Sequence, residues 1–328
     1  MSTPPTRWQS VRRRTLSQVL NRSWAAVSVA GRVAAERHLS GGRVSHVRDL
    51  PYGSGEAPHH RLDVWRPVEN SAGRPVVLYI HGGGFHALSK DTHWLMGLLY
   101  ARRGFVTVNM NYRLAPDHPF PAAIQDVATV WAWIQENIAD FGGDPTRVIV
   151  AGESAGANLA LGLTLCTCTK RPEPWAQDLA TLPVPALLVP TCGVFQVSNL
   201  SRLVDRLPAT TRDMLLAVED AYMVGQEVGG LADPLCILEA GPEMQRAFPP
   251  VCLDVGTRDP LLADTKRLAV ALTSLGVVHE LRTYPGEAHS FHSLAWRTGA
   301  RRCWAHIFDF ISRELPPPPE DELGTARA

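Results

Sequence analysis

The chain has 328 residues, of which 45% are hydrophobic and 20% are charged, a composition typical of a globular protein with a sizeable core. Lysine plus arginine and aspartate plus glutamate number 32 each, so no net field favours nucleic acid or an acidic partner. We therefore expect a small neutral substrate. The length allows one large α/β domain or two ordinary ones, and no apolar run approaches the length of a membrane span.

The first 43 residues are basic at their start and contain an apolar stretch. Three arginines at 12–14 precede Trp24–Ala30, which gives the pattern of a signal or transit peptide, but polar residues such as Arg32 interrupt it. The spacing also suits amphipathic helices between Arg7 and Leu39. We expect these helices to pack on the protein and to contribute to a cap, and the sequence leaves a peripheral membrane contact open.

The cysteines mostly lie in apolar stretches, and none of them forms a C-x-x-C pair. Such thiols fit a buried position in a reducing compartment better than a zinc site, and we expect a cytoplasmic protein without metal or organic cofactor. The six cysteines are Cys166, Cys168, Cys192, Cys236, Cys252 and Cys303.

From residue 44 onward the chain alternates between strand and helix patterns. Val44–Leu50 and His60–Trp65 alternate apolar and polar residues, which predicts an antiparallel pair at the edge of a sheet. Further strands are expected at Val76–Ile80, Phe105–Met110, Val148–Val150, Val184–Val189, Val251–Val255 and Val278–Tyr284. Helices are expected at Trp94–Arg102, Pro121–Ile138, Ala157–Leu161, Leu261–Leu275 and Arg301–Leu315. Repeated β-α-β units predict an α/β fold, a mostly parallel sheet with helices on both faces.

One segment interrupts this alternation and divides the core. Residues 195–247 contain helix and turn patterns without a clear strand, including an acidic helix at Asp213–Tyr222. An insertion at this point is typical of a lid over an active site. We therefore expect a core formed by residues 44–194 and 248–315, a cap at 195–247, and a disordered proline-rich tail at 316–328.

The stretch with the clearest chemical signal is Gly152-Glu153-Ser154-Ala155-Gly156, which joins the strand Val148–Val150 to a helix. In a strand–turn–helix of this kind the serine hydroxyl projects above the sheet as a nucleophile. The flanking glycines avoid collisions with the adjoining elements. The amide of Ala155 opens the helix and can donate to a developing negative charge.

A second glycine-rich turn follows the strand that ends at Ile80. The stretch His81-Gly82-Gly83-Gly84 lets bare backbone approach a substrate, and no Lys-Ser/Thr pair follows that would make it a phosphate-binding P-loop. Beside a reactive serine, such a turn predicts an oxyanion hole.

The base that activates the serine is expected after the last strand. Two histidines follow it, and His289 lies closer to the strand end, in a turn of small residues. The chain order Ser, Asp, His is the one expected in such sheets, so His289 is the predicted base. His292 is expected to point elsewhere, as a surface residue or as a group that supports the site.

The acid that orients the base is expected after the strand Val251–Val255. Asp254 lies within this strand and Asp264 lies a turn into the next helix, whereas Asp259 occupies the loop between them. We therefore assign Asp259 to hold His289 in the tautomer that accepts the serine proton. A simple helix-capping role for Asp259 is the alternative.

Taken together, these motifs resemble the hormone-sensitive-lipase family of carboxylesterases, α/β-hydrolases with an HGGG motif before the serine. The resemblance covers residues 75–295 in the family's order. The matching motifs are His81-Gly82-Gly83-Gly84, Tyr112-Arg113-Leu114-Ala115-Pro116, Phe120-Pro121-Ala122-Ala123 with Asp126, Gly152-Glu153-Ser154-Ala155-Gly156, Asp259-Pro260-Leu261 and His289-Ser290-Phe291.

The resemblance implies a catalytic triad of Ser154, Asp259 and His289, with oxyanion amides from Gly83, Gly84 and Ala155. It also implies that Arg113 and Asp126 brace the fold, and that the N-terminal helices join the 195–247 segment in a cap. The expected activity is hydrolysis of small-molecule esters with short to medium acyl chains, without a cofactor.

Three departures from the family pattern affect the surroundings of the site. Glu153 stands where many members have aspartate, Ser290 replaces the usual glycine, and Leu262-Ala263-Asp264 replaces a charged run. None removes a catalytic group, so they bear on substrate and rate. Acyl transfer to another acceptor, a non-catalytic binding protein and a membrane-associated lipid hydrolase are the alternatives, and a homodimer remains open.

Overall fold

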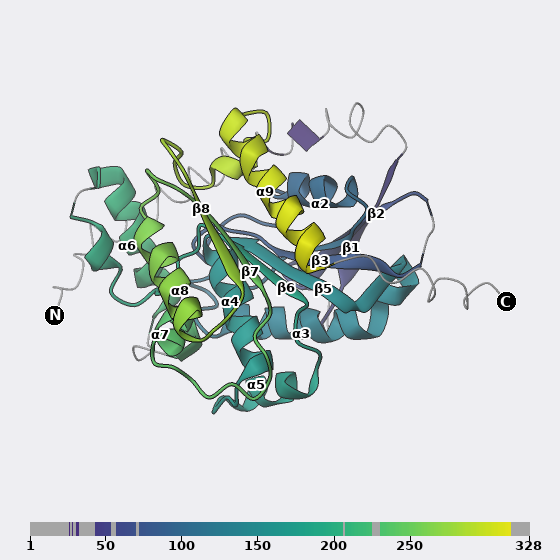
Figure 1. Cartoon of the computed structure of the whole chain (residues 1–328), viewed down its shortest axis with the longest axis horizontal. Helices are drawn as coiled ribbons and strands as arrows, with labels where there is room; N and C mark the ends of the chain where they lie inside the picture. The colour runs from purple at the N-terminus through teal and green to yellow at the C-terminus, as the bar shows by residue number, and fades with distance from the viewer. Residues whose placement is uncertain are drawn as a thin grey trace.

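A computed structural model describes residues 43–53, 57–69, 72–205, 207–224 and 230–315, together with Ala26, Ser28, Gly31 and Arg32. In this part of the chain, eight strands form one sheet in the order β1-β2-β4-β3-β5-β6-β7-β8 (Figure 1). The pairs β1–β2 and β2–β4 are antiparallel, and every other pair is parallel. The predicted α/β fold with an antiparallel edge pair is confirmed. Apart from the four named residues, the predicted N-terminal helices and the tail lie outside the described residues.

Each predicted strand is present, although the one expected at Val148–Val150 begins five residues earlier and the one expected at Val184–Val189 begins later. The strands are β1 (Val44–Pro51), β2 (Arg61–Pro67), β3 (Arg74–Ile80), β4 (Val106–Met110), β5 (Gly143–Glu153), β6 (Leu187–Thr191), β7 (Val251–Gly256) and β8 (His279–Tyr284). The strand expected at Val184–Val189 begins three residues later, because Pro183 and Pro185 have no amide hydrogen to donate to β5.

The helices cover both faces of the sheet, as predicted. They are α2 (Trp94–Ala101), α3 (Ala122–Asn137), α4 (Ala155–Cys168), α5 (Pro174–Gln177), α6 (Ala209–Tyr222), α7 (Pro234–Glu239), α8 (Leu262–Ser274) and α9 (Thr298–Glu314). Successive residues of a strand point to opposite faces. On β3, Val77 packs in one apolar core with α2 and α9, whereas Val76 packs in another with α3, α4 and α8. The strand is therefore buried on both sides.

The segment expected to interrupt the alternation is helical where it is described. It contains α6, α7 and short 3-10 turns at Leu200–Leu203 and Gly230–Ala232. The acidic helix predicted at Asp213–Tyr222 begins one turn earlier, at Ala209. Figure 1 shows α6 outside the sheet, at the left of the molecule.

Arg113 and Asp126 brace the loop between β4 and α3. The Nε atom of Arg113 donates to Oδ1 of Asp126 at 2.9 Å, and the backbone amide of Arg113 donates to Oδ2 at 2.7 Å. Nε2 of His60 lies 3.3 Å from the same carboxylate. These contacts agree with the structural role that the resemblance implies.

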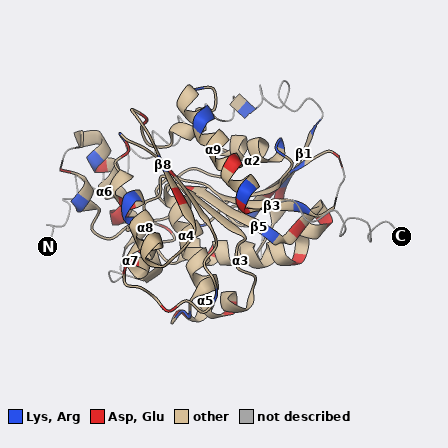
Figure 2. Ribbon diagram, in the orientation of Figure 1, with Lys and Arg blue, Asp and Glu red and all other residues tan. Residues whose placement is uncertain are grey.

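Most of the thiols are buried, and the charged side chains of both signs are mixed along the chain. All six cysteines are free, and five of them are buried, with Cys236 partly exposed. Positive and negative side chains are interspersed over the ribbons in Figure 2. Within the described residues, no helix combines the length and apolarity that crossing a bilayer requires.

Candidate active site

Ser154 occupies a strained turn between β5 and α4. Strand β5 ends at Glu153 and α4 begins at Ala155, and Ser154 between them has φ 54° and ψ −115°. A non-glycine residue with positive φ is costly unless its surroundings enforce it. Here the end of β6 and the residues after it supply that enforcement, because the amide of Ser154 donates to the carbonyl of Thr191 at 3.1 Å and its carbonyl accepts from the amide of Val194 at 3.2 Å.

The glycines on either side of Ser154 are required by close backbone approach. A Cβ atom on Gly156 would lie 2.0 Å from the carbonyl oxygen of Ile80, at the end of β3. A Cβ atom on Gly152 would lie 2.5 Å from the carbonyl oxygen of Gly156. The first turn of α4 therefore sits directly against the strand that leads into the second glycine-rich turn.

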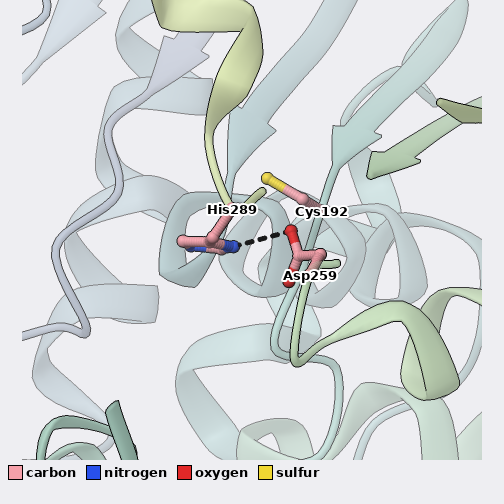
Figure 3. A group of neighbouring side chains, drawn as sticks. All are labelled: Cys192, Asp259 and His289. Carbon is pink, nitrogen blue, oxygen red and sulfur yellow. Dashed lines mark hydrogen bonds and ion pairs between the residues drawn. The ribbon is translucent and has the colours of Figure 1, made fainter. Parts of the chain in front are cut away.

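Asp259 and His289 meet through a direct hydrogen bond. Asp259 follows β7 and His289 follows β8, and Nδ1 of His289 lies 2.9 Å from Oδ2 of Asp259 (Figure 3). The side chain of Asp259 is completely buried, whereas that of His289 is 34% exposed. The other oxygen of Asp259 accepts the amide of Leu261 at 2.8 Å, so the loop at the start of α8 orients the carboxylate.

The electrostatic surroundings of His289 favour its charged form. Burial opposes a positive charge on the imidazole, but the carboxylate of Asp259 and the sulfur of Cys192 together outweigh burial, so the pKa of His289 lies well above its usual range. The sulfur of Cys192, a carboxylate oxygen of Asp259 and a ring nitrogen of His289 all lie within 4.8 Å of one another. The sequence patterns did not single out Cys192 as a neighbour of this pair.

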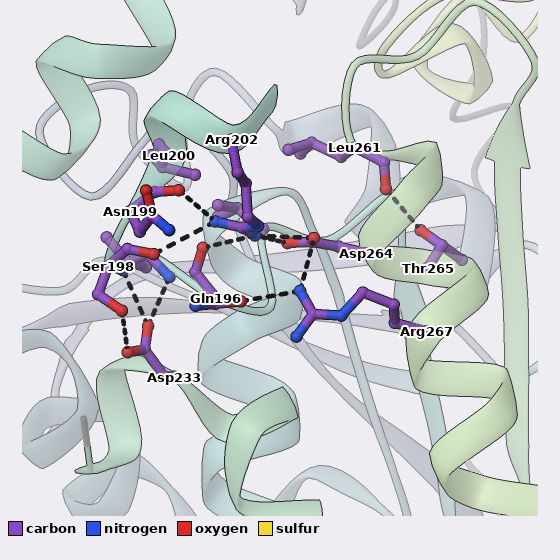
Figure 4. A network of polar contacts seen from close by, with 12 residues as sticks. Gln196, Ser198, Asn199, Leu200, Arg202, Asp233, Leu261, Asp264, Thr265 and Arg267 are labelled. Carbon is purple, nitrogen blue, oxygen red and sulfur yellow. Dashed lines mark hydrogen bonds and ion pairs between the residues drawn. The ribbon is translucent and has the colours of Figure 1, made fainter. Parts of the chain in front are cut away.

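The acids that the sequence analysis set aside have other partners. Asp254 accepts hydrogen bonds from the hydroxyl of Tyr284 at 2.7 Å and from His306 at 2.9 Å. Asp264 is fully buried and pairs with Arg202, at 2.6 and 2.7 Å (Figure 4).

The glycine-rich turn borders the same space as Ser154. Gly83 has φ +113° and Gly84 has φ +59°, both in the region that favours glycine, and both line one cavity with Ser154 and His289. Among the described residues, the backbone amides of Gly83, Gly84 and Ala155 donate no hydrogen bond to another residue. They remain available to an acceptor from outside the protein.

Glu153, the residue before the serine, forms the centre of a buried cluster. One carboxylate oxygen lies 2.8 Å from Nε2 of His93, and the other lies 2.7 Å from Nε2 of His292. Burial opposes the charge of Glu153, but His292 and His93 outweigh it and hold the pKa of this carboxyl well below its usual value. His292 therefore supports the site and is not a surface residue. No sequence motif indicates His93, because only the fold brings it close to the residue before the serine.

His81, the first residue of the glycine-rich turn, is not suited to proton transfer. Its ring stacks on Tyr112 with centroids 4.2 Å apart, and its Nδ1 donates to the carbonyl of Gly82 at 2.7 Å. Burial, together with His93, lowers the pKa of His81 to about 3. The side chain is a neutral support for the turn.

The cavity above Ser154 has a volume of about 820 Å³ and a largely apolar wall. The described N-terminal residues Ser28 and Gly31, helix α6 and the loop before α9 all border it. The apolar residues in the wall are Ala87, Leu88, Trp94, Leu95, Met96, Val194, Met214, Leu215, Ala217, Val218, Pro260, Leu261, Ala288, Leu294 and Trp296.

Comparison with known proteins agrees with this geometry. A family model described as the α/β hydrolase fold matches residues 77–293. Carboxylesterase NlhH of Mycobacterium tuberculosis is 31% identical over 232 residues, which is 70% of each chain, and esterase LipQ of the same species is 27% identical over 80% of this chain and 61% of LipQ.

Solved structures show the same likeness. Esterase LipW from Mycobacterium marinum, 27% identical, superimposes with a TM-score of 0.70 over 95% of this chain and 92% of its own. The thermophilic carboxylesterase EstE1, cloned from a metagenomic library and 23% identical, shares the fold with a TM-score of 0.73 over 92% of this chain and 98% of its own. The chain therefore belongs to the α/β-hydrolase fold family, in its hormone-sensitive-lipase-like group.

Proposed function

We propose that this protein hydrolyses carboxylic esters through an acyl-serine intermediate, with Ser154, His289 and Asp259 as its catalytic triad. The observation that carries the proposal is that His289, which is hydrogen-bonded to Asp259 at 2.9 Å, lines the same cavity as Ser154. The carboxylesterase relatives support the same activity. The amides of Gly83, Gly84 and Ala155 are the proposed oxyanion hole.

In the acylation step, Ser154 Oγ attacks the ester carbonyl while Nε2 of His289 takes the hydroxyl proton. The buried carboxylate of Asp259 keeps the Nδ1 proton of His289 in place, which leaves Nε2 free to act as the base. The carbonyl electron pair moves onto oxygen, and the three amides stabilise that charge, each contributing roughly 2.7–4 kcal/mol in comparable sites.

Collapse of this intermediate expels the alcohol, which takes the proton from His289. Water then attacks the acyl-serine with His289 again as the base, and release of the acid restores the Ser154 hydroxyl. Since each half-reaction uses the same proton carrier, loss of His289 removes both steps.

We also propose that residues 195–247 form the cap of this site, with a contribution from the N-terminal residues. Helix α6 supplies Met214, Leu215 and Val218 to the cavity wall, and Ser28 and Gly31 border it from the N-terminal side. The apolar wall supports esters with short to medium acyl chains as substrates. The six free thiols support a cytoplasmic location.

The test is hydrolysis of a p-nitrophenyl ester series, from acetate to a long acyl chain, by wild type and Ser154→Ala. We expect wild type to prefer a short or medium chain and Ser154→Ala to lose activity by at least about 10³-fold. Ser274→Ala, on the exposed side of α8, is the matched control and keeps wild-type rates.

The intermediate can be tested directly by mass spectrometry of the protein after rapid mixing with a slow ester. An added acyl mass on wild type, absent from Ser154→Ala, is the expected result. Folded wild type that hydrolyses no member of the series would redirect the assignment toward acyl transfer or simple binding.

A further inference from the structure

Cys192 lies beside the Asp259–His289 pair because of an unusual backbone turn. It directly follows β6, has φ +42°, and its amide donates to the carbonyl of Asp254 at 3.0 Å. A non-glycine residue rarely adopts this conformation. The turn buries the thiol completely and brings its sulfur within 4.8 Å of a carboxylate oxygen of Asp259 and a ring nitrogen of His289 (Figure 3).

These three groups are the ligand types that zinc prefers. Thiolate sulfur, imidazole nitrogen and carboxylate oxygen bind Zn²⁺ at about 2.0–2.3 Å, which places tetrahedral ligand atoms roughly 3.5 Å apart. In this protein Nδ1 of His289 and Oδ2 of Asp259 are 2.9 Å apart, and the sulfur is within 4.8 Å of the group. Shifts of about 1.3 Å or less in the side chains therefore complete three ligand positions.

The charge of this group also fits a divalent cation. When Cys192 releases its thiol proton to solvent, the thiolate and the Asp259 carboxylate together balance the two positive charges of the metal. We propose that Cys192, Asp259 and His289 form an inhibitory binding site for a soft divalent cation such as Zn²⁺. That this binding inhibits catalysis rests on the proposed ester hydrolysis.

The reason for inhibition lies in the two nitrogens of the imidazole. Coordination uses the Nδ1 electron pair, so the single ring proton moves to Nε2. An Nε2 that carries a proton cannot accept the proton of Ser154. The metal also displaces the Asp259–His289 hydrogen bond that orients the ring.

A second group of similar composition provides a comparison within the same molecule. Cys252, Asp254 and His306 also lie within 4.8 Å of one another, but they are all buried. Both nitrogens of His306 already have carboxylate partners, Asp254 at 2.9 Å and Glu280 at 3.0 Å. Only the group with Cys192 contains a side chain, His289, that lines the cavity.

The first experiment measures Zn²⁺ binding directly, without reference to activity. Isothermal titration of metal-free Ser154→Ala should show one Zn²⁺ per chain, and Ser154→Ala with Cys192→Ser should bind it at least roughly tenfold more weakly. Cys252→Ser in the same background is the matched control and should bind Zn²⁺ as tightly as Ser154→Ala alone. Cys192→Ala shows whether any loss of Zn²⁺ binding in Cys192→Ser comes from the new hydroxyl group. Circular dichroism checks that both variants are folded.

The second experiment measures inhibition and the ligand set. Zn²⁺ should inhibit ester hydrolysis by wild type and Cys252→Ser, while Cys192→Ser and Cys192→Ala resist it. Co²⁺ bound to wild type should give a thiolate charge-transfer band that Cys192→Ala lacks. Unchanged Zn²⁺ affinity in both Cys192 variants, or loss of binding only in Cys252→Ser, would overturn the site. An inactive wild type that still binds Zn²⁺ through Cys192 would instead count against the proposed function alone.

Discussion

The carboxylate of Glu153 lies 2.8 Å from Nε2 of His93, so the residue before Ser154 is tied to the start of α2. His292 approaches the other carboxylate oxygen at 2.7 Å. This buried contact joins the turn that holds Ser154 to two segments on the opposite face of the sheet from α4. The position of the serine therefore depends on the buried negative charge of Glu153.

Replacing Glu153 by glutamine should weaken both the fold and the activity. The native carboxyl has a depressed pKa, so its charge contributes stability above the unfolded pKa of about 4.3, and that contribution is lost as pH falls through the lower folded value. We expect Glu153→Gln to lower the free energy of unfolding by about 2 kcal/mol at pH 7 and kcat by about tenfold. Urea unfolding at pH 7 and at pH 4 checks this, because the difference should shrink at the lower pH. Glu136→Gln, exposed on α3, is the control; equal losses in both variants would contradict the role of Glu153.

Alanine at Gly83 and at Gly84 should impair activity to different extents. A Cβ on Gly83 would lie 2.2 Å from the backbone carbonyl of Ala87, whereas one on Gly84 would meet a side-chain methyl of Val218 at 2.7 Å. Only the second collision can be relieved, so we expect kcat to fall at least about 100-fold in Gly83→Ala and less in Gly84→Ala. Val218→Ala should partly restore Gly84→Ala. Gly241→Ala, at φ +67° with nothing within 4 Å, controls for backbone strain alone; full activity in Gly83→Ala would remove it from the oxyanion hole.

The pH–rate profile should have its acid limb above the usual range of histidine. The imidazole must be neutral to accept the serine proton, and the pKa of His289 is raised because Asp259 and Cys192 together outweigh burial. We therefore expect kcat/KM to fall as pH decreases, with a midpoint above about 6.5. Initial rates from pH 5 to 9, with EDTA present to exclude bound metal, give the midpoint. A midpoint below the ordinary value would show that burial dominates instead.

Arg202 should be important for stability although it lies outside the active site. Its guanidinium contacts both oxygens of Asp264, at 2.6 and 2.7 Å, and also donates to the carbonyls of Ser198 and Gln196 (Figure 4). Arg202→Met leaves the buried carboxylate of Asp264 with only the more distant guanidinium of Arg267, at 3.5 Å, and we expect a loss of about 3 kcal/mol in the free energy of unfolding.

The double variant Arg202→Met with Asp264→Leu should regain most of that stability, since it removes both charges. Arg102→Met, at the exposed end of α2, is the matched control in urea unfolding. If the double variant were less stable than Arg202→Met alone, the pair would not be the source of the loss.

Much of the fold could be predicted because its signals are local. The apolar β-branched runs and the helical periodicity of Pro121–Ile138 each depend on neighbouring residues, and they gave the order of strands and helices. The shift of β6 also has a local cause, the prolines at 183 and 185. Asp259 and His289 could be proposed because each follows a parallel strand, and such strand ends meet at one edge of the sheet.

The remaining features depend on contacts between distant parts of the chain. Nothing near His93 in the sequence indicates that its ring reaches Glu153, 60 residues away. The position of Cys192 beside His289 depends on a positive φ that its residue type does not predict. For His292 the sequence left two alternatives open, a surface residue or a group that supports the site. Its burial depends on the packing of α9, whose Trp304 donates a hydrogen bond to the carbonyl of His292.

Several separate segments of the chain line the cavity, so a bound molecule can stabilise the fold against unfolding and proteolysis. Ser28 accepts a hydrogen bond from Trp94, and both line the cavity, as do helix α6 and Trp296 near the other end of the described chain. A molecule that fills this space touches all of these segments at once, and its binding free energy adds to the free energy that holds them in place. We expect proteases to cleave the empty protein sooner than the filled one, so that substrate supply also sets how long each copy survives.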